Sequence, residues 1–336
     1  VSDADIQKNK KCFVVLQCFQ WILISCLRAD SVGADTSNYA RIFDDHKNIP
    51  WKECFKYFKT YYIDKEIIYH FEPGFVLFEK LVSSIWDNQG FYKFVVALIF
   101  MSSLGQYVYK NSEDPFIAFL LYSGLFYNMF SLTGYRQVLS VAIGILWGYK
   151  YIEERKFFKF LLLVLIASTL HKSTLIFIIY YFISQKKVTN TFMMLFGILL
   201  YIMISYRYYL FEYVKEIVGY EEFGISTGFS QRNFLMLFSI KSVIIIWRHK
   251  YVANLTPKSD IYYNGFFLSA AMIPFAMVSP TSMRLVYDFL FILMILLPKV
   301  YKSFPDENDR TIAYTVSILV FGFFVLTKSV PYEFFW

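Results

Sequence analysis

The stretch FFKFLLLVLIASTLHKSTLIFIIYYFIS, residues 157–184, is almost wholly apolar, yet it carries His171 and Lys172 at its centre. As one straight helix it would reach about 42 Å, well beyond a hydrocarbon core of about 30 Å. Divided at His171, it gives two arms of about 14 and 12 residues, each too short to cross a bilayer. The lengths therefore predict a re-entrant helical hairpin with His171 and Lys172 at its tip, surrounded by protein or by a wet cavity.

The remainder of the chain is also unusually apolar. Of its 336 residues 57% are hydrophobic, 21% are aromatic and only 18% are charged, whereas about a quarter of the residues of a soluble domain are charged. The apolar residues form long blocks, which is typical of an all-α, polytopic integral membrane protein. We expect a single domain over 1–336 that contains about nine to ten spans and the hairpin. The expected spans are 11–27, 91–109, 115–133, 135–152, 191–210, 233–247, 261–278, 284–301 and 311–327.

The lysines and arginines of the short loops indicate an orientation. If the N-terminus is inside and the hairpin returns to the side from which it came, roughly sixteen of them fall inside and roughly six outside, as cytoplasmic loops require. If 157–184 crossed the membrane once, every later loop would change sides, and the excess of lysines and arginines in those loops would lie outside. Two large loops, 28–90 and 211–232, are then outside. The first contains WKECFKYFKTYYIDKEIIYHF, residues 51–71, whose apolar spacing predicts helix lying along the interface.

Several polar residues collect on this outer side, close to the predicted membrane surface. They are Arg28, Glu72, Arg136, His171, Lys172 and Arg284. Cations and carboxylates at one level form a candidate site for a large polyanion beside a group that needs acid–base chemistry. Structural roles stay open for each of them, because arginines at helix ends anchor at the interface. Asp35 before Thr36 likewise has the pattern of a helix cap, with Gly33 supplying a turn.

Motifs of other chemistries are missing from the sequence. The four cysteines, Cys12, Cys18, Cys26 and Cys54, form no CxxC pair, so neither a disulfide framework nor a metal site is indicated. There is no HExxH, Walker or GxGxxG motif. The net charge of +7 follows from the topology and gives no reason to expect nucleic acid as a partner.

Five short motifs follow one another on the predicted outer side. They are R-x4-G-x-D-x3-Y (Arg28, Gly33, Asp35, Tyr39), E-P-G-F (72–75), Y-R-Q (135–137), A-x3-H-x-S (Ala167, His171, Ser173) and R-L-x-Y (Arg284, Leu285, Tyr287). In this order the chain, from about residue 12 to 300, resembles the EpsG-like branch of the Wzy-type bacterial polysaccharide polymerases. Ala34 and Lys172 depart from the residues that are commoner in that family.

The resemblance implies a GT-C-like glycosyltransferase of the bacterial cytoplasmic membrane, multi-pass, with its active site facing the periplasm or exterior. The implied reaction joins undecaprenyl-pyrophosphate-linked oligosaccharide repeat units. The growing chain is transferred to a sugar hydroxyl and undecaprenyl pyrophosphate is released, without nucleotide sugar, cofactor or metal. The implied partners are this lipid-linked oligosaccharide and membrane lipids, and a chain-length regulator protein is a further candidate.

The site residues have expected roles in such a reaction. A departing pyrophosphate needs cations, and the arginine fork bonds phosphate oxygens bidentately and stays ionised. The candidates for binding the pyrophosphate and the sugars are Arg28, Arg136, Gln137, Lys172, Arg284, Tyr135 and Tyr287.

The acceptor hydroxyl needs a general base on the opposite side of the anomeric carbon. His171 is the preferred candidate, because histidine is the side chain that exchanges protons closest to neutral pH. Asp35 and Glu72 are rival bases, and either could instead bind sugar hydroxyls or orient His171. With the base opposite the leaving group, the displacement inverts the anomeric configuration.

Three other functions compete with this interpretation. A flippase or other transporter of lipid-linked oligosaccharides would have an internal repeat and charges lining a path through the bilayer, whereas here the polar residues crowd one face. A membrane O-acyltransferase would take its acyl-CoA from the cytosol and place its cations inside. An O-antigen ligase performs the same chemistry on a different acceptor, and the sequence barely separates it from a polymerase.

Overall fold

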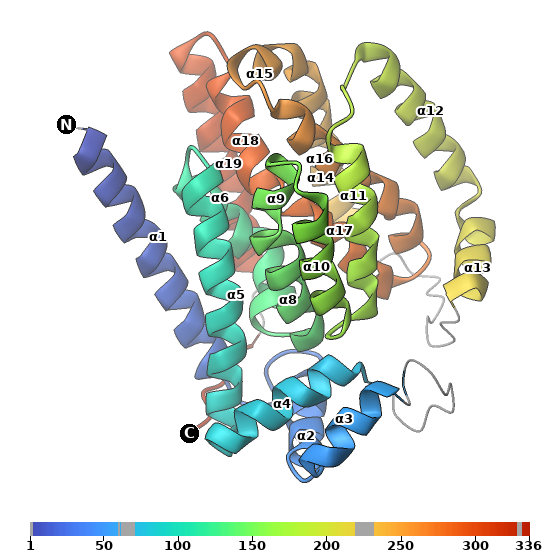
Figure 1. Cartoon of the computed structure of the whole chain (residues 1–336). Coiled ribbons are helices and arrows are strands. Elements are labelled where there is room, and N and C mark those ends of the chain that lie inside the picture. The colour runs from blue at the N-terminus through green and yellow to red at the C-terminus, as the bar shows by residue number, and fades with distance from the viewer. Residues whose placement is uncertain (1–2, 60, 62–70, 219–231, 328–330) are drawn as a thin grey trace. The chain divides into compact units, whose positions relative to one another are not determined.

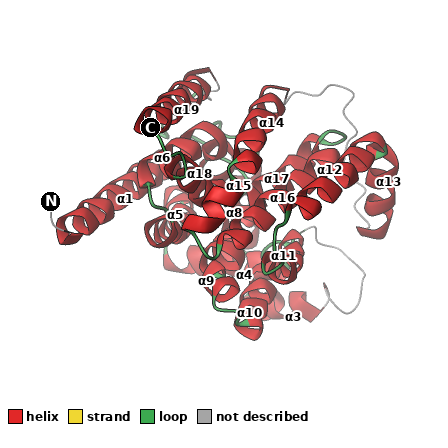
Figure 2. Cartoon of the chain, turned by 90° about the horizontal axis from the view of Figure 1, so that it is seen from above, coloured by secondary structure: helices red, strands yellow, loops and turns green. Residues whose placement is uncertain are grey.

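The computed structural model of the chain describes residues 3–59, 61, 71–218, 232–327 and 331–336. Within these ranges the secondary structure is helical, apart from an isolated bridge between Arg28 and Phe334, and Figure 2 draws helices and loops without a strand. The all-helical fold expected from the apolar blocks is therefore confirmed. The packing divides the chain into two compact units, one formed by 1–178 with 318–336 and the other by 179–317.

In the described part of the first unit, ten α-helices precede the hairpin tip. They are α1 (Asp3–Cys26), α2 (Thr36–His46), α3 (Trp51–Lys59), α4 (Pro73–Ile85), α5 (Gln89–Asn111), α6 (Pro115–Leu121), α7 (Tyr127–Ser131), α8 (Tyr135–Val141), α9 (Tyr149–Glu153) and α10 (Phe157–Ser168). π-Helical turns at 122–126 and 142–147 join α6 to α7 and α8 to α9. The expected spans 115–133 and 135–152 are thus helical but interrupted, because each contains such a turn.

The second unit begins within α11 (Phe177–Ser184) and ends within α19 (Glu307–Thr327). Between them lie α12 (Asn190–Ser205), α13 (Arg207–Val218), α14 (Arg232–Trp247), α15 (His249–Leu255), α16 (Ser259–Ala276), α17 (Met283–Leu290) and α18 (Leu293–Lys302). The residues 219–231, which include most of the expected outer loop 211–232, lie outside the described residues.

Two helices of the described residues are long and apolar enough to cross a membrane on their own, α5 and α19. α12 and α13 would form a third span together, but they are bent by 80°. The single span expected over 191–210 therefore differs from the structure, in which the first helix ends at Ser205. The Arg207 guanidinium donates to the Ile204 carbonyl at 2.9 Å and so satisfies one of the last carbonyls of α12.

The expected hairpin has the predicted break at its centre. α10 ends at Ser168, and the His171 N–H donates to the Ala167 carbonyl at 3.0 Å. His171 has extended backbone, with φ −158° and ψ 116°, and a 3₁₀ turn over 172–176 leads into α11. Neither arm is long enough to cross a membrane. The tip residues therefore lie on a turn between two short apolar helices.

Three helices occupy the region between α1 and α5, which the sequence assigns to the outer loop 28–90. Figure 1 shows α2, α3 and α4 gathered at one end of the first unit, beyond the ends of α5, α8 and α10. The expectation that this loop carries helices is confirmed, and α3 covers the first part of the stretch 51–71. Residues 60 and 62–70 of that stretch lie outside the described residues, and the position of these helices along the membrane interface stays a prediction. The loop helices and the hairpin tip thereby come to the same end of the unit, where the candidate site lies.

Candidate functional site

The beginning of α4 lies directly against the hairpin tip. Pro73 occupies the first turn of α4, where its missing N–H costs nothing. The Gly74 N–H donates to the Thr169 carbonyl at 2.9 Å. A Cβ on Gly74 would lie 2.1 Å from Thr169 Oγ1, so only glycine permits this approach. The motif E-P-G-F therefore serves to bring one helix end against the turn that carries His171.

The Glu72 carboxylate connects three groups at this contact. Its Oε2 lies 2.8 Å from Arg136 Nη1. Its Oε1 lies 3.2 Å from His171 Nδ1 and accepts the Lys172 backbone N–H at 3.0 Å. Three residues that follow Glu72 by 64 to 100 positions in the sequence therefore share its carboxylate.

The charge state of Glu72 follows from these contacts. Its residue is 4% exposed, and burial alone raises the pKa of a carboxyl group. The hydrogen bond from His171 and the charge of Arg136 outweigh this effect and lower the pKa of Glu72 to about 2. The group is therefore a carboxylate at neutral pH, and it can accept a hydrogen bond from the Nδ1–H of His171.

Arg136 is held by aromatic groups as well as by Glu72. Its guanidinium lies over the Phe71 ring at 4.7 Å, and its Nε lies 3.5 Å from the Tyr39 hydroxyl. The Tyr39 ring stacks on Tyr135 at 4.8 Å with an angle of 12°. The side chain of Arg136 is 19% exposed, so the guanidinium is fixed in place while part of it faces solvent.

Lys172 places a second positive charge at the hairpin tip, on an exposed side chain. It is exposed, and its Nζ lies 4.4 Å above the ring of Tyr61. The neighbouring Tyr57 hydroxyl donates to the Phe71 carbonyl at 2.7 Å. Aromatic residues that follow α3 and precede α4 therefore border both cations of the site.

Arg28 is buried and has a different position from the one expected of a phosphate ligand. It is 1% exposed, and its guanidinium donates to the Ser25 carbonyl and, at 2.5 Å, to the Tyr135 hydroxyl. The chain around Arg28 is clamped by the C-terminal segment, since the Ala29 N–H donates to the Glu333 carbonyl at 2.8 Å. These bonds favour a supporting role, in which Arg28 holds Tyr135 against Tyr39.

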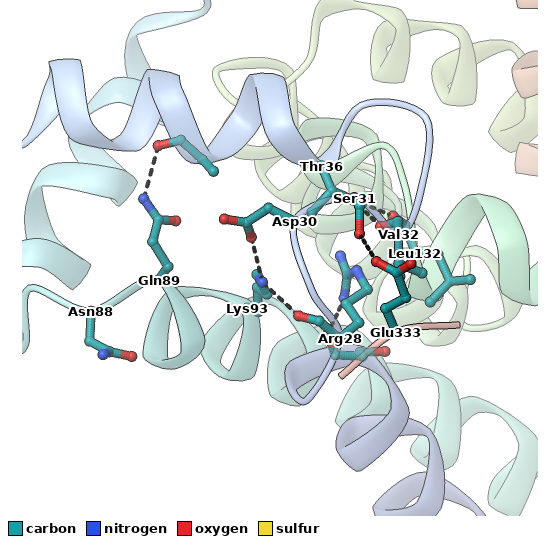
Figure 3. Close-up of polar contacts among 12 residues, drawn as sticks. Arg28, Asp30, Ser31, Val32, Thr36, Asn88, Gln89, Lys93, Leu132 and Glu333 are labelled. Atoms are coloured by element: carbon teal, nitrogen blue, oxygen red, sulfur yellow. Dashed lines mark hydrogen bonds and ion pairs between the residues drawn. The ribbon is translucent and has the colours of Figure 1, made fainter. Parts of the chain in front are cut away.

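Lys93 is a second buried cation, which the sequence interpretation missed. Its Nζ lies 2.6 Å from Asp30 Oδ1 and 2.8 Å from the Arg28 carbonyl oxygen (Figure 3). Lys93 is 4% exposed and is the fifth residue of the apolar helix α5. An ionisable residue within an expected span is costly unless it has a partner, and this signal could have identified Lys93.

Asp35 stands at the N-cap position of α2, as its sequence context predicts, but its side chain makes no capping hydrogen bond. Gly33 does supply the expected turn, with a φ of +98°, and a Cβ there would lie 1.9 Å from the Leu132 carbonyl oxygen. The Thr36 hydroxyl lies 2.8 Å from the same oxygen. The loop before α2 is thus packed on the turn before α8, and Gln137 of α8 is buried at 2% exposure.

Arg284 and Tyr287 belong to the second unit. Both lie on α17, where the Tyr287 ring meets the Phe234 ring edge-on at 5.7 Å. The structure thus brings together Glu72, Arg136, His171 and Lys172 within the first unit. Tyr39 contacts Arg136 there, and Tyr135 stacks on Tyr39. The pyrophosphate and sugar contacts expected of Arg284 and Tyr287 stay predictions.

Replacing Gly74 by alanine is expected to separate α4 from the hairpin tip. The new methyl group would overlap Thr169, and such overpacking typically lowers the free energy of unfolding by about 1–3 kcal/mol. Thermal unfolding of the purified protein measures this change. The matched control is Gly197→Ala in α12, because a Cβ there would meet nothing within 4 Å. Equal behaviour of the two variants would contradict the close approach.

Comparisons with known proteins give one match. A family model described as the EpsG family matches residues 11–335 of the chain. No curated protein and no solved structure matches it. Among the described residues, no group of three or more histidines, cysteines, aspartates and glutamates has a geometry that could hold a metal ion.

Proposed function

The chain belongs to the EpsG family, which indicates a membrane-bound, polysaccharide-polymerase type of glycosyltransferase, and from this premise we propose a specific reaction. The protein joins oligosaccharide repeat units carried on undecaprenyl pyrophosphate, on the outer side of the bacterial cytoplasmic membrane. The hydroxyl of an incoming unit attacks the anomeric carbon of the growing chain. Undecaprenyl pyrophosphate leaves with the electron pair of the broken C–O bond. A chain-length regulator protein is a candidate partner.

The cations of the site support the departure of the pyrophosphate. Lys172 is part of the hairpin tip, and Arg136 is oriented beside it by Glu72 and by the Phe71 ring. Electrostatic stabilisation by groups that are already in place is often the largest contribution to catalysis, at about 10²–10³-fold for each donor. Glu72 neutralises one of the two positive charges. The exposed ammonium of Lys172 therefore supplies the net charge that a diphosphate requires.

His171 is suited to accept the proton of the attacking hydroxyl. Because its Nδ1 faces the Glu72 carboxylate, the Nδ1–H donates a hydrogen bond to Glu72, and the Nε2 lone pair is left to accept a proton. A carboxylate in this position also stabilises the imidazolium that forms. We therefore assign His171 as the general base and Glu72 as the residue that orients it, with inversion at the anomeric carbon.

The other candidate residues of the first unit have supporting or sugar-binding roles in this proposal. Tyr135 and Gln137 stand on either side of Arg136 in α8 and are buried, and Arg28 holds the Tyr135 hydroxyl. Asp35 stands at the start of α2, where it is partly exposed, and we assign it to sugar hydroxyls rather than to base catalysis. Sugar rings can stack on the aromatic side chains that border the site.

One observation carries this proposal, namely the Glu72 carboxylate shared by His171 and Arg136. It joins a proton acceptor to a phosphate-binding cation, and glycosyl transfer from a pyrophosphate needs both. The test is to incubate the purified protein with a lipid-linked repeat unit, without nucleotide, and to separate the products by length. A ladder of longer chains with release of undecaprenyl pyrophosphate is expected. Transfer only to an added lipid A-type acceptor would instead indicate a ligase, and movement across the bilayer without new glycosidic bonds would indicate a transporter.

A further inference from the structure

α4 carries a second buried carboxylate, two turns beyond Glu72. Glu79 is 0% exposed. Its Oε2 meets His46 Nδ1, and its Oε1 accepts the Tyr92 hydroxyl at 2.6 Å. None of these three residues belongs to a motif that the sequence singles out. The cluster therefore has a chemistry similar to that of the Glu72–His171 pair but no contact with solvent at its carboxylate.

The partner helix α2 repeats the same spacing. His46 follows Tyr39 by seven residues, as Glu79 follows Glu72 on α4. Seven residues are about two turns and about 10 Å along a helix. α2 and α4 are thus connected at two levels. At the first level Arg136 lies between the Tyr39 hydroxyl and the Glu72 carboxylate, and at the second His46 binds Glu79 directly.

Tyr92 connects this second level to the helix that carries Arg136. Its ring stacks on Phe43 of α2 at 4.6 Å with an angle of 15°. The same ring meets Tyr135 of α8 edge-on at 5.4 Å. Tyr135 is the residue before Arg136, and it stacks on Tyr39. A shift of Tyr92 would therefore reach the Tyr39 hydroxyl through Tyr135, and it would reach Glu72 through Glu79 on the same helix. These are the two groups that flank the Arg136 guanidinium.

The cluster is unsuited to direct chemistry. Glu79 is fully buried, so no substrate reaches it, and burial raises the pKa of its carboxyl group against the opposing effects of His46 and Tyr92. Buried polar pairs of this kind contribute little net stability, and their best-attested use is to fix one register of the packed elements. The equal spacing on α2 and α4 indicates that use here.

We infer that the His46–Glu79–Tyr92 cluster positions Arg136 for the reaction, because it fixes the register of α2 against α4 and so the separation of Tyr39 from Glu72. This inference rests on the proposed function. Its residues are positioning residues and touch no substrate. Misplacement of a reacting group by about 1 Å can lower a rate by about 10²-fold, so a loose register should be visible in kcat.

The test compares the same substitution in two backgrounds. Glu79→Ala is made in the natural chain and in Arg136→Lys, which keeps a cation but lacks the guanidinium fork. The rate of polymer formation is measured with the lipid-linked repeat unit. In the natural chain Glu79→Ala should lower kcat by about tenfold or more. In the Arg136→Lys background the further loss should be less than about twofold, because residues that act through one another are not additive.

Two controls separate positioning from simple destabilisation. Tyr92→Phe keeps the ring contacts but removes the bond to Glu79, and it carries the same comparison if Glu79→Ala does not fold. Glu53→Gln, at an exposed ion pair with Lys56 on α3, should change neither background. Equal fold-losses in both backgrounds, or no loss in the natural chain, would overturn the inference. The absence of a ladder from the natural protein would instead refute the proposed function.

Discussion

Replacing His171 by alanine is expected to lower the rate of polymer formation by about 10²–10⁴-fold, the usual contribution of a general base. Single lipid-linked units should accumulate, because the change removes the proton acceptor but not the Arg136–Glu72 pair that supports the leaving group. Length analysis of the glycan products, with and without the substitution, measures the effect. Chains of unchanged length would remove His171 from the mechanism.

Chemical rescue distinguishes loss of the base from damage to the hairpin. In His171→Ala the side-chain space is open, and added imidazole can accept the proton there. We expect imidazole to restore part of the rate, increasingly as the pH rises through the range in which free imidazole is neutral. Gly74→Ala, which displaces the tip through Thr169, should gain nothing from imidazole. Rescue of neither variant would indicate that His171 has a structural role.

The break at His171 could be predicted from the sequence because its evidence is local, whereas the re-entrant course of 157–184 stays a prediction. The segment 157–184 is too long for one crossing and too short for two, and a histidine and a lysine interrupt it. The structure places the break at these residues. The π-helical turns in α6–α7 and α8–α9 were missed, since they interrupt apolar stretches that contain no charged residue at the break. The bend after Ser205 was also missed, although Arg207 follows it directly.

The candidate site shows the opposite situation, because its contacts are non-local. The sequence identifies Glu72, Arg136 and His171 singly, but the shared carboxylate joins residues 64 and 99 positions apart. A charged residue at a helix end can be recognised in the sequence, but the sequence does not show which way its side chain points. Arg28 therefore has the same sequence signature as Arg136, although its guanidinium is buried against Ser25 and Tyr135.

The His46–Glu79–Tyr92 cluster could not be predicted from the sequence, because its contacts are also non-local. His46 and Glu79 are separated by 33 residues, and both belong to the region 28–90, which is rich in ordinary charged residues. Their burial is visible only once α2 packs on α4. The equal seven-residue spacing on the two helices can be read in the sequence afterwards, but nothing in the sequence pairs Tyr39 with Glu72 beforehand.

Glu72→Gln should impair both halves of the proposed reaction at once. The neutral amide cannot hold His171 in the required tautomer, and it leaves Arg136 without its counter-charge. The loss in kcat should be on the order of 10²–10⁴-fold, comparable with that of His171→Ala. Glycan length analysis measures it. Asp87→Asn, at an exposed carboxylate just beyond α4 that pairs with Lys47, is the matched control and should retain the rate.

The effect of Glu72→Gln on the free energy of unfolding should depend on pH. The pKa of Glu72 is lowered from 4.5 to about 2 in the folded protein, so its stabilising effect is fully present above pH 4.5 and is lost as the pH falls through about 2. Such a change corresponds to about 3 kcal/mol. The natural protein should therefore exceed Glu72→Gln in free energy of unfolding by about this amount at neutral pH, and the gap should close toward pH 2. A gap that is independent of pH would mean that Glu72 is not ionised in the folded site, and it could then neither orient His171 nor balance the charge of Arg136.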